Sequence, residues 1–418
     1  MPGEITLHGK LNRTVFQTLP TTQKVYLLLE VTPAAAAVGH APLNAGFVLD
    51  RSGSMAGDKI QYVRDAVNLI LRRMQSQDRV ALVLFDDKVD LLAPNQPLAD
   101  SIALQAQVDA IVERGGTTMA KGMRKGLEEL RRGQSPKRVS RMILLTDGET
   151  YGDEEECREL ARECGEAGIP ISAFGLGDEW NADLLDAIAQ YSGGQSDLLA
   201  APEQIIAEFQ HTLQAMQGTV ATNASLTLRL VSGVAPAAAW RIVPQISKLD
   251  ARAISDRDVQ LYLGDLETGG GQSILIELVV QPKPEGAYRV AQAEVTYDLP
   301  GAGLRGERMR ADIMLTLAEN PARVSPPDPE LMNLIEKVSV FKLQTRALTE
   351  AQAGNLGLAT QQLRTAATRL LSLGETELAE AAAQEIANLE QQGQLSAAGT
   401  KKLQYGTRKL TQRLDEPA

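Results

Sequence analysis

Three short segments of this sequence concentrate side chains that offer oxygen ligands. They are Asp50-Arg51-Ser52-Gly53-Ser54, Gly115-Gly116-Thr117-Thr118 and Thr146-Asp147-Gly148. Together they supply two carboxylates and several hydroxyls, and none of them contains cysteine or histidine. Hard oxygen donors suit Mg²⁺ or Mn²⁺, and hydroxyls are too weak to hold a metal without the carboxylates. The three segments therefore predict a site for a hard divalent cation.

Enzymatic interpretations of these residues fit less well. A nucleophilic aspartate of the haloacid-dehalogenase type requires a second acid at position 52, where Ser52 stands. Residues 53–59 have the wrong spacing for a phosphate-binding P-loop. The histidines His8, His40 and His211 lie outside the three segments, and no nucleophile elbow is present. Hydrolysis by a metal-bound water stays open as an alternative. We predict that the protein is not an enzyme.

Each of the three segments lies where a predicted strand meets the following loop or where a loop enters a helix. Residues 44–50, 79–87 and 141–149 contain apolar runs without polar alternation, which is typical of strands covered on both faces. Amphipathic helical patterns separate these runs. Residues 44–217 are thus predicted to form an α/β domain with a doubly wound, mostly parallel sheet, which binds ligands at the carboxyl ends of its strands.

The pattern changes on both sides of this domain. Residues 218–320 alternate with a period of two between glycine and proline turns, which predicts an antiparallel β-sandwich. Residues 1–43 contain similar strands but too few to bury a face alone, so we assign them to the same sandwich, with the α/β domain inserted. Residues 325–414 are rich in Ala, Leu, Gln and Glu, and predict a C-terminal domain of four helices.

The order Asp-x-Ser-x-Ser, Gly-Gly-Thr and strand-terminal Thr-Asp-Gly resembles the metal-ion-dependent adhesion site of von Willebrand factor type A domains. The motif is complete here, and the whole arrangement is similar to bacterial proteins in which such a domain is set into a β-sandwich and followed by helices. The resemblance implies direct metal binding by Ser52 and Ser54, approach of Thr117 from the second loop, and binding largely through waters by Asp50 and Asp147.

Thr118 is the local alternative to Thr117, but only the first threonine matches the family pattern. The resemblance also implies adhesion or scaffold work. An uncharged inner shell of hydroxyls and waters leaves the ion enough positive character to attract an external carboxylate. The first hypothesis is a metal-dependent protein interaction module that binds a Glu or Asp of a partner protein. The alternative is a regulatory or scaffold subunit of an ATP-driven or kinase/phosphatase signalling assembly, docked through the helical tail.

The composition of the chain argues against two classes of binding partner. Asp and Glu outnumber Lys and Arg by 53 to 42, for a net charge of -11, which argues against nucleic acid and anionic membranes. No apolar run approaches the roughly 20 residues of a membrane helix. The absence of a secretory signal and two cysteines placed as free thiols, Cys157 and Cys164, predict a cytoplasmic protein. The oligomeric state is left open.

Two charged segments are expected to be ordinary solvent-exposed structure. Residues 86–90 are expected to form a solvated turn, with a part in the rim of the site as the alternative. Residues 401–413 are expected to form a solvated final helix, with contact to an acidic partner or a lipid surface as the alternative.

Overall fold

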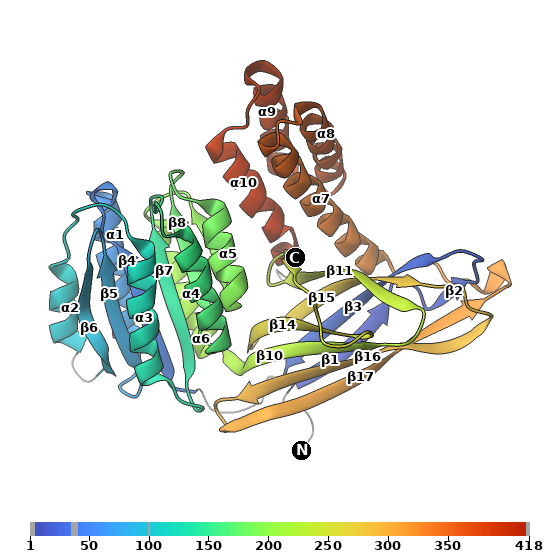
Figure 1. Cartoon of the computed structure of the whole chain (residues 1–418), viewed down its shortest axis with the longest axis horizontal. Helices are drawn as coiled ribbons and strands as arrows, with labels where there is room; N and C mark the ends of the chain where they lie inside the picture. The colour runs from blue at the N-terminus through green and yellow to red at the C-terminus, as the bar shows by residue number, and fades with distance from the viewer. Residues whose placement is uncertain (1–4, 35–40, 99–100, 415–418) are drawn as a thin grey trace.

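The computed structural model describes residues 5–34, 41–98 and 101–414. It has an α/β part, a pair of packed sheets and a helical region (Figure 1). The predicted fold class, an α/β chain with a mostly parallel sheet, additional antiparallel β-structure and C-terminal helices, is confirmed. None of the described helices combines the length and apolar character needed to cross a membrane.

The α/β part contains a six-stranded sheet with the order β6-β5-β4-β7-β8-β9, in which only β6 runs antiparallel to its neighbour. Its strands are β4 (Leu43–Asp50), β5 (Arg79–Phe85), β6 (Val89–Pro97), β7 (Val139–Thr146), β8 (Ile171–Leu176) and β9 (Gln195–Leu199). Every residue of β4 and β7 is buried, which explains their continuous apolar runs.

Helices cover both faces of this sheet. One face packs against α1 (Asp58–Arg73), α2 (Ser101–Asp109) and α6 (Gln204–Gln217), and the other against α3 (Met119–Gly133), α4 (Glu154–Glu166) and α5 (Ala182–Ser192). Within β4, Phe47 and Leu49 enter the first core and Val48 enters the second. This alternation fixes the direction of each side chain up to Asp50, the last residue of the strand.

The other two sheets enclose a single apolar core. One has the order β1-β3-β15-β11-β12 and the other β13-β14-β10-β16-β17-β2, so strands from before and after the α/β part share each sheet. The strands are β1 (Ile5–Leu11), β2 (Val15–Gln17), β3 (Gln23–Pro33), β10 (Thr219–Leu230), β11 (Val234–Val243), β12 (Ser247–Leu249), β13 (Arg252–Ala253), β14 (Asp258–Glu267), β15 (Gln272–Val280), β16 (Gly286–Leu299) and β17 (Leu304–Ala318).

The helical region covers the outer face of the five-stranded sheet. It contains α7 (Pro329–Gln352), α8 (Leu356–Ser372), α9 (Thr376–Gln392) and α10 (Ala397–Arg408), followed by a short 3₁₀ helix over Lys409–Leu414. In β3, Leu27 and Leu29 face the core between the sheets, while Leu28 faces a second core formed with α7. The helical cover therefore explains why β3 is apolar on both faces.

The prediction that residues 401–413 form a solvated helix is wrong. Helix α10 lies between α5 and α7 (Figure 1), and it buries Leu403, Tyr405 and Thr407. Its polar side chains are also engaged, because Asp186 of α5 accepts hydrogen bonds from Gln404 Nε2 (2.7 Å), Tyr405 Oη (2.9 Å) and both terminal nitrogens of Arg408. The buried face is mostly polar, so its apolar pattern in the sequence is weak.

We predict that Asp186→Asn destabilises the protein by about 2–3 kcal/mol, because Arg408 would keep its place in a largely buried site without its carboxylate partner. Urea unfolding and hydrogen exchange of α10 amides would measure the change. The matched control is Asp183→Asn, an exposed acid on the same helix, whose effect should stay within about 0.5 kcal/mol. Equal effects of the two substitutions would contradict a docking role for the Asp186 contacts.

Candidate metal centre

The carboxyl ends of β4 and β7 meet at the centre of the α/β sheet. The two strands are parallel neighbours, with Leu49 opposite Leu145, so Asp50 at the end of β4 lies beside Thr146 and Asp147. The next strand in sequence after β4 pairs on its other side, which makes this the point where the strand order reverses. Open α/β sheets bind ligands at such points.

Asp50 organises the loop that follows its own strand. The carboxylate is fully buried; its Oδ1 accepts the Ser52 backbone N–H at 2.7 Å, and its Oδ2 accepts the Thr146 hydroxyl at 2.6 Å. Burial raises the pKa of Asp50 to about 6, against the hydrogen bonds of Thr146 and Ser52, which lower it; the nearby charge of Asp147 adds to the rise. Burial of the charged form of this carboxyl group therefore costs free energy.

Three hydroxyls converge above the buried carboxylates. Ser52 Oγ and Ser54 Oγ are 3.0 Å apart, and Ser54 Oγ donates to Asp147 Oδ1 at 2.6 Å. A Cβ atom placed on Gly148 would lie 3.9 Å from both Ser54 Oγ and Thr117 Oγ1, so Thr117 reaches the same space from the second loop. The fold therefore brings together all five predicted ligand residues, and Ser54 is exposed while the two carboxylates are buried.

The glycines of the second loop allow it to approach the first. Gly53 N donates to Gly115 O at 3.1 Å, which joins the two loops. Gly115 has a positive φ of 74°, and a Cβ atom on Gly116 would meet Asp87 Oδ1 at 2.6 Å. A side chain at either position would be strained or displace Asp87. The positive φ of Gly115 favours glycine there, and both glycines leave room for the side chains of Asp86 and Asp87.

Sequence reasoning missed Lys59, which lies five residues after Ser54 in the first turn of α1. Its ammonium group forms an ion pair with Asp147 Oδ2, and about a third of the Lys59 side chain is exposed. This contact shows that the carboxylate side of the site accepts a cation. Lys59 could have been recognised in the sequence, because it lies only five residues after Ser54 and the start of the helix fixes its position relative to the loop.

The donor set fits a hard divalent cation. All five side chains present oxygen, and two of them are carboxylates. Over the described part of the chain, no group of three or more His, Cys, Asp or Glu side chains gathers in a metal-binding arrangement. A metal here must therefore rely on the hydroxyls and on water. His8 and His211 are exposed on β1 and α6, and His40 lies outside the described residues.

Residues 86–90 are more than a solvated turn. Asp86 is buried and accepts hydrogen bonds from Arg51 Nε (2.7 Å) and Arg114 Nε (2.9 Å), while Asp90 accepts one from each of the same arginines. Burial alone would raise the pKa of Asp86, but the hydrogen bonds from Arg114, Lys88 N–H and Arg51 bring it below its ordinary value. The solvated-turn interpretation is wrong for Asp86, and the segment holds the rim of the site.

Comparison with known proteins identifies two parts of the chain. Residues 45–205 match the model of the von Willebrand factor type A domain, and residues 329–413 match that of the Sll0103-like C-terminal alpha-helical domain. The uncharacterized protein sll0103 of Synechocystis is 29% identical over 359 residues, which cover 83% of each chain. Inter-alpha-trypsin inhibitor heavy chain H3 of the rat is 29% identical over 197 residues, which are 44% of this chain and 22% of that protein.

Two solved structures resemble the whole chain. The first is a von Willebrand factor type A protein from Catenulispora acidiphila, with a TM-score of 0.77, 15% identity and 96% coverage of both chains. The second is the ArnB paralog VWA2 from Sulfolobus acidocaldarius, with a TM-score of 0.58, 14% identity and coverage of 98% and 99%. At these identities the likeness concerns the fold. The chain therefore contains a von Willebrand factor type A domain, followed by a Sll0103-like C-terminal helical domain.

Proposed function

We propose that this protein is a divalent-metal-dependent interaction module that binds a Glu or Asp side chain of a protein partner. Asp50, Ser52, Ser54, Thr117 and Asp147 would hold Mg²⁺ or Mn²⁺ as an intact adhesion-type metal site. The observation that carries the proposal is the convergence of three hydroxyls, one of them on an exposed residue, above two buried carboxylates.

The chain's own residues explain why such a site would recognise an acid. When bound, the metal would supply a positive centre for the partner's carboxylate. Asp50 is committed to Ser52 and Thr146, so its role toward a metal is to orient the loop and supply charge. The exposed hydroxyl of Ser54 adds no negative charge that would repel an acidic partner. We assign no catalytic step to the site.

The proposal extends to the organisation of the chain. We assign residues 1–43 and 218–320 to one β-sandwich domain, with residues 44–217 inserted as the type A domain and residues 325–414 as the tail. Support comes from β3, which pairs with β1 on one side and, on its other side, with β15 from beyond the α/β part. A cytoplasmic location is proposed from the free thiols Cys157 and Cys164, which are buried on α4.

One observation favours the second candidate, a scaffold subunit docked through the tail. Leu358 and Leu371 of α8 are 48% and 59% exposed, which is high for large apolar side chains. Partner capture that persists in chelator and is lost on Leu358→Gln with Leu371→Gln would favour this candidate. Capture that disappears in chelator would favour the metal site.

We expect Asp50→Asn to reduce Mg²⁺ and Mn²⁺ affinity by about 10- to 100-fold, because the residue orients the ligand loop and supplies one of two charges. Isothermal titration calorimetry of the full chain tests this. The control is Asp65→Asn, an exposed acid on α1, which should bind metal as the wild type does. Failure of the wild type to bind either ion would sink the proposal for the isolated protein.

The same substitution should stabilise the metal-free protein. The raised pKa of Asp50 means that the folded state prefers the protonated form, so this carboxyl makes stability fall as pH rises from about 4 to about 6, and the loss persists above pH 6. Asn at this position removes the buried charge, which corresponds to a gain of up to about 3 kcal/mol at pH 7. Chemical unfolding with chelator across pH 4 to 8 would measure it. A less stable variant at pH 7 would contradict the assignment.

Lys59→Met should increase divalent-metal affinity about three- to tenfold, because the ammonium group occupies Asp147 Oδ2 and repels a second cation. Calorimetry with Mn²⁺ gives the ratio, and Lys88→Met, an exposed charge on the rim, serves as the control. Unchanged or weaker affinity in the Lys59 variant would show that the lysine supports the site instead of competing for it.

A further inference from the structure

The most exposed large hydrophobic side chain among the described residues lies close to the candidate metal centre. Tyr151 is 80% exposed and stands four residues after the predicted ligand Asp147, on the loop between β7 and α4. Its hydroxyl donates to Glu149 Oε2 at 2.9 Å, and Glu149 is exposed as well. An aromatic ring and a carboxylate, both open to solvent, thus lie next to each other on a loop of the proposed site.

Hydrogen bonds hold this loop in place on either side of Tyr151. Thr150 Oγ1 accepts the Met119 backbone N–H at 3.3 Å and donates to Asp153 Oδ1. Asp153 Oδ2 in turn accepts the Ala120 backbone N–H at 2.9 Å. The loop is therefore tied to the first turn of α3, which begins directly after the second loop of the metal site. Tyrosine is enriched among the residues that dominate the binding energy of protein interfaces, so an exposed tyrosine on a fixed backbone suits a partner contact.

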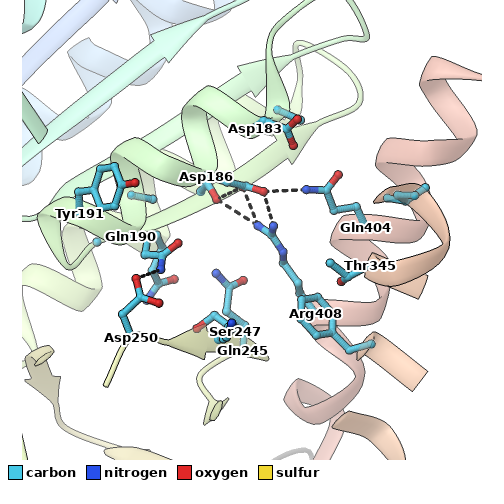
Figure 2. A pocket seen from close by; sticks show the side chains of 18 of the residues that line it. Asp183, Asp186, Gln190, Tyr191, Gln245, Ser247, Asp250, Thr345, Gln404 and Arg408 are labelled. Atoms are coloured by element: carbon cyan, nitrogen blue, oxygen red, sulfur yellow. Dashed lines mark hydrogen bonds and ion pairs between the residues drawn. The ribbon is translucent and has the colours of Figure 1, made fainter. Parts of the chain in front are cut away.

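The carboxylate of Glu149 is not neutralised by the chain. Its hydrogen bond comes from the neutral Tyr151 hydroxyl, and no ion pair to it occurs in the described part of the chain. Glu149 lines one part of a crevice of about 1430 Å³ between the α/β part, the packed sheets and the helical region. Figure 2 shows another part of this crevice, where Asp186 faces Arg408 and Gln404. Asp186 is compensated within the chain, whereas Glu149 is left for a partner.

The same crevice already holds one lysine against an aromatic ring. Lys401 Nζ lies 4.3 Å from the centroid of the Trp180 ring and donates to the carbonyls of Asp178 and Trp180. Burial lowers the pKa of Lys401, against the charges of Asp178 and Glu149. An ammonium group packed on a ring is therefore compatible with this environment, and the charge of Glu149 favours it.

The exposed charges around the metal site are mostly acidic. We counted charged residues within four positions of a predicted ligand or on the rim segment 86–90. Those that are exposed and have no ion pair among the described residues are the acids Asp58, Asp87, Glu113 and Glu149 and the bases Lys88 and Lys121. Arg51, Lys59 and Arg114 are bound to acids of the chain itself. A purely acidic partner would therefore be repelled, and a partner that brings a carboxylate to the metal must also bring positive charge.

We propose that the partner carries an arginine or lysine beside its metal-binding acid, and that this base packs on the Tyr151 ring and pairs with Glu149. The inference rests on the proposed metal-dependent function and specifies the partner as a protein segment with neighbouring acid and base. Two residues span at most about 7 Å, which is the reach from Asp147 to Glu149 along the loop, so a base within about two residues of the acid can make the contact. A guanidinium stacks on an aromatic face and extends beyond its edge, where the carboxylate lies, so arginine suits both contacts.

The test is a selection of random short linear peptides displayed on phage. The full-length protein would be immobilised in saturating Mn²⁺ and eluted with chelator, so that metal-dependent binders are recovered. We expect the recovered sequences to share an Asp or Glu with an Arg or Lys within about two positions of it. In calorimetry, a synthetic peptide of the most frequent sequence should bind about five- to tenfold more tightly than the same peptide with Gln in place of the base.

Variants identify the residues that select the base. The double variant Glu149→Gln with Tyr151→Leu should recover peptides that keep the acid and show no preference for a base. Tyr151→Phe keeps the ring face and should retain the preference. The matched control is Glu159→Gln, an exposed acid on α4, which should select peptides as the wild type does. Calorimetry with Mn²⁺ on each variant separates a loss of metal from a loss of base recognition.

The outcomes separate this inference from the proposed function. Recovered peptides that share an acid without a neighbouring base would overturn the inference and leave the metal-dependent function standing. A preference for the base that persists in the double variant would also overturn it, because another surface would then select the base. If chelator elutes no peptide, or only peptides without a shared acid, the proposed function fails and the inference fails with it.

Discussion

The buried carboxylate of Asp50 is the contact on which the candidate metal centre depends. It connects β4 to β7 through the Thr146 hydroxyl and fixes the start of the next loop through the Ser52 N–H. These two bonds are possible only because the strands are parallel neighbours that end at the same level. The cost of burying the charge is visible in the raised pKa of Asp50. Perturbed pKa values of this kind are typical of functional sites.

Successive side chains of the first loop, residues 50–54, point in alternate directions and therefore have different roles. Asp50, Ser52 and Ser54 face the cluster of oxygens, while Arg51 turns to Asp86 and Asp90. Arg114 grips the same two acids from the second loop, so a four-membered charged cluster holds both loops at one distance. The hydroxyls are thereby positioned by charged groups that are not themselves predicted metal ligands, as pre-organised sites require.

Charged and polar contacts also join the three parts of the molecule. Arg141 of β7 pairs with Asp265 of β14, and Arg408 of α10 pairs with Asp186 of α5. Lys401 Nζ donates to the carbonyls of Asp178 and Trp180, above the Trp180 ring. In each case acceptor groups in one part of the molecule compensate a cation that belongs to another part.

The sequence by itself determined the elements and the composition of the site. Continuous apolar runs, helical periodicity and period-two alternation were enough for the fold class, since each reflects which faces of an element are buried. The three oxygen-rich segments were recognisable because each is short and local. The tertiary structure alone decided which distant charges meet. Packing between elements far apart in the chain brings together Lys59 and Asp147, Arg51 and Asp86, and Arg408 and Asp186. Polar side chains carry no periodic signal for such contacts, because a charge is stable on the surface and equally stable when a partner from elsewhere in the fold neutralises it.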